Sequence, residues 1–271
     1  MNAPPSSEVP LNALLTPRRI GLARWGIEVP DGWQQGRGAF GGIVIGAMIR
    51  ALEAHVADAQ RPLRSLTAEI CGPVFAGSAE LAVETLRAGS GVSTAACRLL
   101  QGAEIQAHAV GVFGRTRAED LDGLHLAAPR MRPWRDWAPI ALGPHAPPFA
   151  RQFEFRTAGP LPYSGGAELE VEGWVRPKAP GIERDAAYLA ACADAWWSPV
   201  HGLVSAPRPL ATIAFTLQLC GTLEGLDPDA PLFHRGRDVV IRDGYFVEFR
   251  ELWGEDGRLV ALNQQTFAVI R

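Results

Sequence analysis

Apolar residues recur in the first part of the chain with the spacing of an α-helix. Within residues 41–59, Ile45, Ile49, Leu52 and Val56 fall three or four positions apart. This spacing places them on one face of a helix that can pack against a core. The pattern therefore predicts a helix over residues 41–59, preceded by the glycine-rich loop GWQQGRGAFGG.

A second helix is predicted over residues 182–197, and its apolar end contains a single carboxylate. The run YLAACADAWW has Asp194 among alanine, cysteine and tryptophan residues. A negative charge near a helix C-terminus opposes the helix dipole, so this position is not a casual one for an acid. Its helical neighbours Ala187, Ala190 and Ala191 are small and apolar, which indicates a packed face.

The remaining pattern is that of short strands separated by Gly and Pro, with GEDG predicting a hairpin turn between the last two. After a first strand over 19–29, we predict strands at 65–74, 79–89, 92–101, 104–114, 152–157, 167–177, 209–221, 236–244, 245–254 and 258–271. Each half of the chain thus has a strand, a helix and several antiparallel strands, which is an α+β duplication. Two such sheets could pair edge to edge and bring the helices together.

This duplication divides the chain into four segments. Residues 1–18 are rich in Pro and Ser and are predicted to be a flexible leader. Residues 19–114 and 151–271 form the two repeats. The Pro-rich, charged segment 115–150 lacks a sustained period and is predicted to connect them.

Composition and charge favour a folded protein that acts on a small molecule. Hydrophobic residues make up 47% and charged residues 20%, with a formal net charge of −3. Arginine is dispersed, so we expect neither a nucleic acid nor a membrane surface as partner. The four cysteines lack metal-ligand spacing, and we expect no metal. With no secretory signal pattern, the expected location is the cytoplasm.

The ordered motifs of the two halves resemble a known family. The first half contains AFGGIVIGAMIRALEA, and the second contains ADAWW, LATIAF and DGRLVALNQQ. In this order, over residues 19–271, they are similar to the TesB-like acyl-CoA thioesterases. The resemblance implies a double hotdog, an α+β fold in which each of two tandem repeats wraps an antiparallel sheet around a long helix. It also implies hydrolysis of an acyl-CoA thioester to a free acid and CoA, with no cofactor beyond the CoA of the substrate.

The resemblance also implies three catalytic side chains. The family uses an Asp on the second helix, a Thr or Ser on the next strand and a Gln on the last strand. By motif these are Asp194, Thr212 and Gln265. Gln264 stands beside Gln265, and because side chains alternate along a strand, only one of the two can face the site.

The start of the first helix offers backbone donors for an oxyanion. Phe40, Gly41 and Gly42 lie there, and free N–H groups at a helix N-terminus favour negative charge. In enzymes of this kind the helix start of one half and the acid of the other share a site, so Gly41 or Gly42 is expected to face Asp194. The first helix has no acid at the equivalent place, and nearby Glu53 is assigned no chemistry. One active site is therefore predicted.

Two other functions remain open. A non-catalytic module that binds acyl-CoA or lipid would have no need of the Asp-Thr-Gln set. A hotdog enoyl-CoA hydratase or dehydratase is suggested only by Asp120 and His125, whose spacing matches that class but which fall in the connecting segment. No GxSxG elbow supports a serine hydrolase.

The sequence leaves the substrate's finer identity open. It specifies neither the acyl chain nor whether the thiol is CoA or a carrier protein. Hotdog proteins usually assemble further, so we expect a homo-oligomer, a dimer of double hotdogs.

Overall fold

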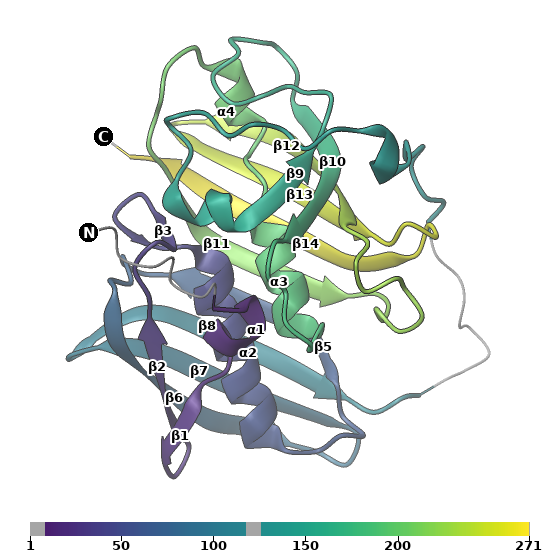
Figure 1. Ribbon diagram of the computed structural model, residues 1–271. Helices are drawn as coiled ribbons and strands as arrows, with labels where there is room; N and C mark the ends of the chain where they lie inside the picture. The colour runs from purple at the N-terminus through teal and green to yellow at the C-terminus, as the bar shows by residue number, and fades with distance from the viewer. Residues whose placement is uncertain (1–8, 118–125, 271) are drawn as a thin grey trace, which may run out of the picture.

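The computed structural model describes residues 9–117 and 126–270 (Figure 1). The first half places its longest helix, α2, among strands of one sheet. Its elements are α1 (Leu11–Leu14), β1 (Arg18–Gly21), β2 (Arg24–Val29), β3 (Gln34–Gln35), β4 (Gly38–Ala39), α2 (Gly41–Val56), β5 (Leu63–Ile70), β6 (Gly77–Ala88), β7 (Val92–Gln101) and β8 (Glu104–Gly114).

The second half repeats this plan after two short 3₁₀ turns. Its elements are η1 (Trp134–Asp136), η2 (Pro148–Gln152), β9 (Phe153–Arg156), β10 (Glu170–Pro177), α3 (Ala186–Asp194), α4 (Val200–Leu203), β11 (Leu210–Leu219), β12 (Leu232–Arg242), β13 (Tyr245–Trp253) and β14 (Leu259–Val269).

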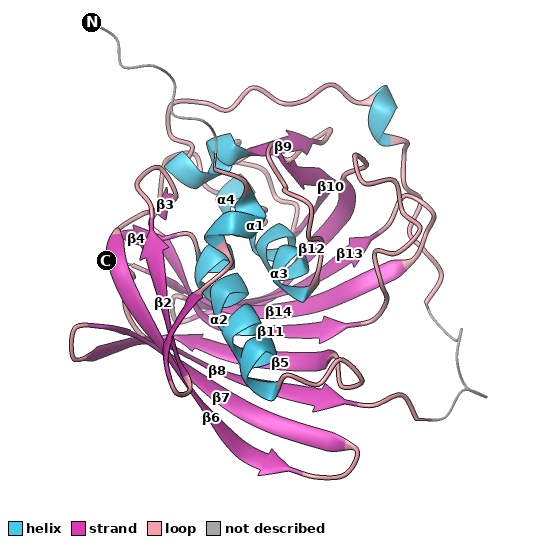
Figure 2. Cartoon of the chain, turned by 60° about the horizontal axis from the view of Figure 1, so that its bottom comes forward, coloured by secondary structure: helices cyan, strands magenta, loops and turns pink. Residues whose placement is uncertain are grey.

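Twelve strands form one continuous sheet that joins the two halves. Their order is β1-β2-β6-β7-β8-β5-β11-β14-β13-β12-β10-β9. The joint is the antiparallel pair β5–β11, in which Ala68 lies opposite Phe215. The sheet curves around α2 and α3, which lie side by side on its concave face (Figure 2). The predicted α+β double hotdog, with sheets joined edge to edge, is confirmed.

The two central helices run antiparallel at close range. A β-carbon on Gly42 would lie 2.9 Å from the Cα of Ala191, and one on Gly46 would lie 3.3 Å from the carbonyl oxygen of Ala187. These two glycines therefore permit the backbones to approach each other. The start of α2 consequently meets the end of α3, where the acid predicted from the sequence is located.

The helix boundaries are narrower than the sequence predicts. Helix α2 ends at Val56 because Ala57 adopts the left-handed conformation (φ 48°). Helix α3 begins only at Ala186, since the Asp185 carboxylate accepts a hydrogen bond from the Tyr188 backbone N–H at 3.0 Å and caps the helix. The apolar residues that follow Asp194 continue as an irregular segment.

Two predictions for the first 42 residues require correction. The first strand is interrupted by a turn in which Ala23 has φ 55°, and it becomes the β1–β2 hairpin. The described part of the predicted leader is ordered: Leu11 and Leu15, one helical turn apart, are fully buried. Their apolar side chains face the core, which a Pro- and Ser-rich composition does not reveal.

The connecting segment 115–150, in its described part, packs against the second repeat. The Trp134 ring lies 4.9 Å from the Arg156 guanidinium and 4.3 Å from that of Arg135. The Trp174 indole donates a hydrogen bond to the Arg132 carbonyl at 2.8 Å. These contacts tie the connection to the strands at the sheet edge.

Candidate active site

Asp194 is the last residue of α3, and its side chain is buried at the junction of the two halves. Only 6% of the residue is exposed. One carboxylate oxygen, Oδ1, accepts a hydrogen bond from Gln265 Nε2 at 3.0 Å. The other, Oδ2, lies so close to α2 that a β-carbon on Gly41 would be 2.7 Å away. The apolar run YLAACADAWW therefore encloses an acid that reaches across to the other helix.

A chain of hydrogen bonds links this carboxylate to two further strands. The Thr212 hydroxyl donates to Gln265 Oε1 at 2.9 Å, and Gln265 Nε2 donates both to Asp194 and to Asn263 Oδ1, at 3.0 Å each. Both ends of the Gln265 amide are thus engaged, which fixes its orientation. Thr212 reaches the carboxylate through Gln265.

A β-bulge in β11 determines which way Thr212 points. In the pairing with β14, Phe215 lies opposite Gln265, but the register shifts between Ala214 and Thr212, so that Thr212 lies opposite Phe267. Gln265 and Phe267 are two residues apart and share a face. The extra residue therefore turns Thr212 from the outer face, which Ala214 occupies, to the inner face of the sheet.

The alternation of β14 assigns the two adjacent glutamines to opposite faces. Gln265 is fully buried on the inner face, whereas Gln264 is exposed on the outer face. Only the Gln264 backbone N–H makes a local contact, donating to the Thr216 hydroxyl at 3.3 Å. Gln265 is therefore the residue that meets Asp194.

The start of α2 faces the acid with its backbone. Gly41 and Gly42 occupy the first turn, where N–H groups have no partner within the helix. The Gly42 N–H donates a hydrogen bond to the Asp194 carboxylate. The Gly41 N–H lies in the same turn, beside the same carboxylate. Neither glycine has room for a side chain. A β-carbon on Gly41 would lie 2.7 Å from Asp194 Oδ2, and one on Gly42 would lie 2.4 Å from the ring of Phe40.

Phe40 does not have the donor role predicted for it. Its backbone N–H donates to the Trp33 carbonyl at 2.8 Å and is therefore already engaged. Its fully buried ring stacks on Phe149 with 4.2 Å between the ring centroids. Phe40 thus supports the helix start through packing, and the sequence did not reveal the carbonyl that takes its N–H.

The ionisation of Asp194 reflects opposing influences. Burial raises its pKa above the usual range of a carboxyl group. The positive charge of Arg250 and the hydrogen bonds from Gln265 and Gly42 lower the pKa, but the net direction is upward. The carboxylate is therefore a stronger proton acceptor than an exposed aspartate, which is the property that a general base requires.

The family of this chain follows from two matches that together span most of its length. The model of the acyl-CoA thioesterase N-terminal domain matches residues 29–114, and that of the acyl-CoA thioesterase C-terminal domain matches residues 123–269. The chain belongs to the acyl-CoA thioesterase family. This confirms the resemblance to the TesB-like enzymes. No curated protein matches the chain.

Solved structures share the double hotdog of this thioesterase family member at low sequence identity. A conserved hot dog protein from Alicyclobacillus acidocaldarius is 21% identical with a TM-score of 0.85, covering 96% of this chain and 98% of that one. A putative thioesterase II from Thermobifida fusca YX is 21% identical, with a TM-score of 0.82 and coverages of 96% and 97%. The acyl-CoA thioesterase II TesB2 from Mycobacterium marinum is 17% identical, with a TM-score of 0.76 and coverages of 96% and 98%.

The site of this thioesterase family member also contains polar residues that the sequence analysis missed. They lie on the inner face of the sheet in the second repeat and are Asn263, Glu248, Arg250, Asp238 and His234, each at most 6% exposed. A signal for two of them is present in β13, where the inward positions of YFVEFRELW read Phe, Glu, Arg, Leu. Charged residues at alternate positions within an apolar face are the pattern that would have revealed them.

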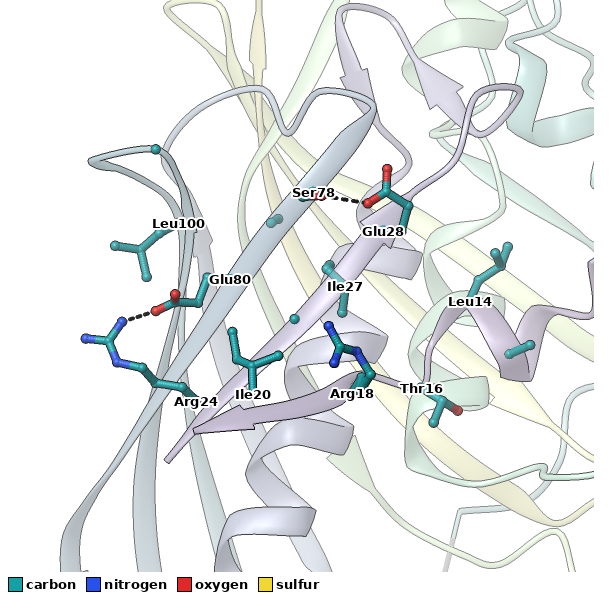
Figure 3. Close-up of a pocket in the computed structure, with 14 residues that line it drawn as sticks. Leu14, Thr16, Arg18, Ile20, Arg24, Ile27, Glu28, Ser78, Glu80 and Leu100 are labelled. Atoms are coloured by element: carbon teal, nitrogen blue, oxygen red, sulfur yellow. Dashed lines mark hydrogen bonds and ion pairs between the residues drawn. The ribbon is translucent and has the colours of Figure 1, made fainter. Parts of the chain in front are cut away.

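A surface groove of about 740 Å³ lies away from this site, on the first repeat (Figure 3). Two polar pairs line it, Arg24 with Glu80 and Ser78 with Glu28. The groove includes none of the residues around Asp194, and its charged groups neutralise one another. The groove is therefore separate from the site around Asp194.

Asp120, His125 and Glu53 are the other titratable groups singled out from the sequence. Asp120 and His125, the pair that suggested a hydratase, fall outside the described residues. Glu53 lies near Asp185, at the opposite end of α3 from Asp194. Within the described part of the chain, no helix is long and apolar enough to cross a membrane.

Proposed function

We propose that this chain hydrolyses an acyl-CoA thioester to a free acid and CoA, with Asp194 as general base. The observation that carries the proposal is the position of this buried carboxylate, which lies between Gln265 and the start of α2. Family membership supports the reaction class, and the side-chain roles are argued from the geometry.

The first step requires a water molecule activated beside the scissile carbonyl. Asp194 accepts a proton from this water, and the oxygen attacks the thioester carbon to form a tetrahedral oxyanion. Gln265 holds the carboxylate in place, and Thr212 fixes the Gln265 amide. Breaking of the carbon–sulfur bond then releases the CoA thiol, which takes up the proton.

The developing oxyanion needs a donor that is already in position. The first turn of α2 supplies backbone N–H groups together with the positive end of the helix dipole. The Gly42 N–H donates to Asp194, so the N–H of Gly41 is the donor we assign to the oxyanion. The absence of a side chain on Gly41 leaves room for the Asp194 carboxylate beside this backbone.

A binding module without catalysis is the second candidate, because the fold alone could enclose an acyl group. The hydrogen-bonded set of Asp194, Gln265 and Thr212 argues against it, since burying a carboxylate costs free energy and binding alone would not require one here. Acyl-CoA is the proposed substrate class. A dimeric assembly and a cytoplasmic location stay predictions from the sequence.

The test is the release of free thiol from a panel of acyl-CoAs with short, long and aryl acyl groups. Asp194→Asn keeps the shape of the side chain and removes the base. We expect the wild type to release CoA and the variant to be at least about a hundredfold slower, the scale of a general base. Binding of acyl-CoA without turnover by the wild type would support the binding module instead.

A further inference from the structure

One row of side chains runs across eight neighbouring strands of the concave sheet, from β6 to β12, and changes character at the joint between β5 and β11. In the first repeat it consists of Val83, Cys97, Ala109 and Ala68, all buried and apolar. Beyond the β5–β11 joint it continues as Phe215, Gln265, Glu248 and Asp238, of which three are polar and buried. The two repeats thus place different chemistry at matching positions beneath their helices.

The polar half of this row lies under the helix that bears Asp194. A buried carboxylate reduces stability unless it is paired. The first repeat has no acid equivalent to Asp194, and its side chains at the matching positions of the row are apolar. Glu248 is fully buried and lies directly opposite Gln265, the partner of Asp194. The polar row is therefore part of the site around Asp194.

Arg250 connects this row to the end of α3. It is 2% exposed, and its Nη1 donates to the Ala193 carbonyl at 2.8 Å. Its Nη2 donates to Glu248 Oε2 at 2.9 Å. Ala193 is the residue before Asp194, so the guanidinium holds the backbone that carries the acid. A cation at a helix C-terminus is also favoured by the helix dipole.

Three buried carboxylates share this one guanidinium. Besides Asp194 they are Glu248, whose pKa is raised by burial to about 7, and Asp238, whose pKa is raised by burial to about 6. Burial lowers the pKa of His234, so this ring is neutral. Burial disfavours the charged form of all three carboxyl groups, and the positive charge of Arg250 opposes this effect in each of them.

Several elements pack around Asp194 and contribute groups that face it. The charged and titratable groups that face it or Arg250, among the described residues, are Glu248 and Arg250 from β13, Asp238 and His234 from β12, and His201 from α4. Strand β14 contributes the amides of Asn263 and Gln265, and helix α2 contributes the Gly42 N–H.

We propose that Arg250, fixed by Glu248, is a positioning residue that keeps the Asp194 carboxylate ionised and directed at the start of α2. The proposal rests on the proposed thioesterase function, and it adds a residue outside the Asp-Thr-Gln set. The alternative is that Arg250 and Glu248 only hold the sheet and helix together.

The positioning role and the structural role of Arg250 predict different results when Glu248 alone is replaced and when Arg250 is replaced as well. Glu248→Gln removes the ion pair but leaves an amide oxygen that can still accept a hydrogen bond from Arg250. Adding Arg250→Met in the double variant also removes the cation, and because position 248 is already neutral, no ionised side chain is left there without its partner. If Arg250 and Glu248 are purely structural, both variants should show the same acid limb, which is the fall of kcat/KM at low pH.

The experiment measures that acid limb in the wild type, Glu248→Gln, the double variant, Arg250→Lys and the control Arg237→Met, which removes an exposed cation from β12. We expect the acid limb to move upward by about one pH unit or more in the double variant, the effect of losing a nearby opposite charge. The other three variants should keep the wild-type limb. Equal limbs in the double variant and Glu248→Gln, or a raised limb in Arg250→Lys, would overturn the proposal.

A second readout separates this proposal from the function on which it rests. The titration of the Asp194 carboxyl group can be followed by carbon NMR, with Asp194→Asn identifying its signal, and this needs no turnover. If no acyl-CoA is hydrolysed but the titration moves as expected, only the proposed function fails. If hydrolysis is observed and the titration is the same in the wild type and the double variant, only the role of Arg250 fails.

Discussion

At the scale of single residues, Gln265 is the part on which the site depends. Its amide donates to two oxygens, one on Asp194 and one on Asn263, and accepts from the Thr212 hydroxyl. No other orientation of the amide would satisfy these three partners. A residue with no charge of its own therefore determines where the carboxylate points and helps to keep it ionised.

Replacing this residue should impair catalysis, whereas replacing its neighbour should not. We expect Gln265→Ala to lower kcat by about ten- to a hundredfold, because a hydrogen bond to a charged group contributes about 1.5–3 kcal/mol. The acid limb should also move upward, since the lost bond lowers the pKa of Asp194.

Gln264→Ala is the matched control, because its exposed side chain lies on the opposite face of the same strand. Steady-state kinetics over a pH series measures both variants. A similar loss of activity in the two would show that the face assignment of β14 does not matter for catalysis.

The sequence predicted single residues unevenly. Asp194 was identified by its unusual surroundings, and Thr212 and Gln265 by their motifs. Arg250 and Glu248 were missed because each is an ordinary surface residue unless the direction of its strand is known. Phe40 was assigned as a donor because nothing in the sequence shows that the Trp33 carbonyl would take its N–H.

At the scale of elements, the bulge in β11 is the feature with the largest effect on the site. The strand runs Thr212, Ile213, Ala214, Phe215, and simple alternation would place Thr212 on the face opposite to Phe215. One extra residue reverses this and turns the hydroxyl toward Gln265.

Thr212 and Thr216 therefore offer a comparison within one strand. We expect Thr212→Val to lower kcat by about fivefold, the value of one neutral hydrogen bond of about 1 kcal/mol. Thr216→Val, on the outer face, should retain the wild-type rate. Both substitutions keep a β-branched side chain, so strand propensity is unchanged. The initial rates with the best substrate of the panel decide the comparison.

Elements were predictable where their pattern was regular. Most strands and both central helices follow alternation or a three-to-four spacing. The bulge was not predictable, because no Gly marks it and it depends on the register in which β11 pairs with β14. The β1–β2 turn was missed for a similar reason, since Leu22 and Ala23 are not typical turn residues.

At the scale of the whole molecule, the antiparallel helix pair has two unlike ends. One end joins the start of α2 to Asp194. The other joins α2 to the start of α3 through Arg50, which forms ion pairs with Glu183 at 2.6 Å and Asp185 at 3.1 Å. Arg50 also donates to the Thr16 hydroxyl, so the N-terminal segment closes this second end.

Glu53 makes this second end sensitive to pH. Its pKa is raised from 4.5 to about 7, chiefly by burial and then by the charge of Asp185. Because the folded-state pKa is above that of the unfolded chain, its contribution to stability is complete below pH 4.5 and is lost as the pH rises through 7.

Glu53→Gln should therefore raise Tm at pH 8 and leave it nearly unchanged at pH 5. Thermal unfolding at the two pH values provides the measurement, with Glu224→Gln, an exposed acid, as control. An equal change in Tm at both pH values would contradict the buried, protonated state of this carboxyl group.

The duplication itself was predictable from the repeated order of elements, and so was the joining of the two sheets. The sequence revealed only part of the difference between the two ends of the helix pair. The sequence shows that α2 has no acid to match Asp194, but not that Arg50 contacts Asn12 and Thr16 of the N-terminal segment there. Leu11 and Leu15 are buried by contacts with segments far along the chain.

Because the β5–β11 joint lies within one chain, the site can form at any protein concentration. The start of α2 and the acid of α3 come from different repeats, so two separate hotdog chains would form this arrangement only on meeting in solution. A single chain presents each repeat to the other at an effective concentration set by the connection between them. Fusion thereby favours the pairing of two repeats with different interiors, one apolar and one polar, over the pairing of either repeat with a second copy of itself.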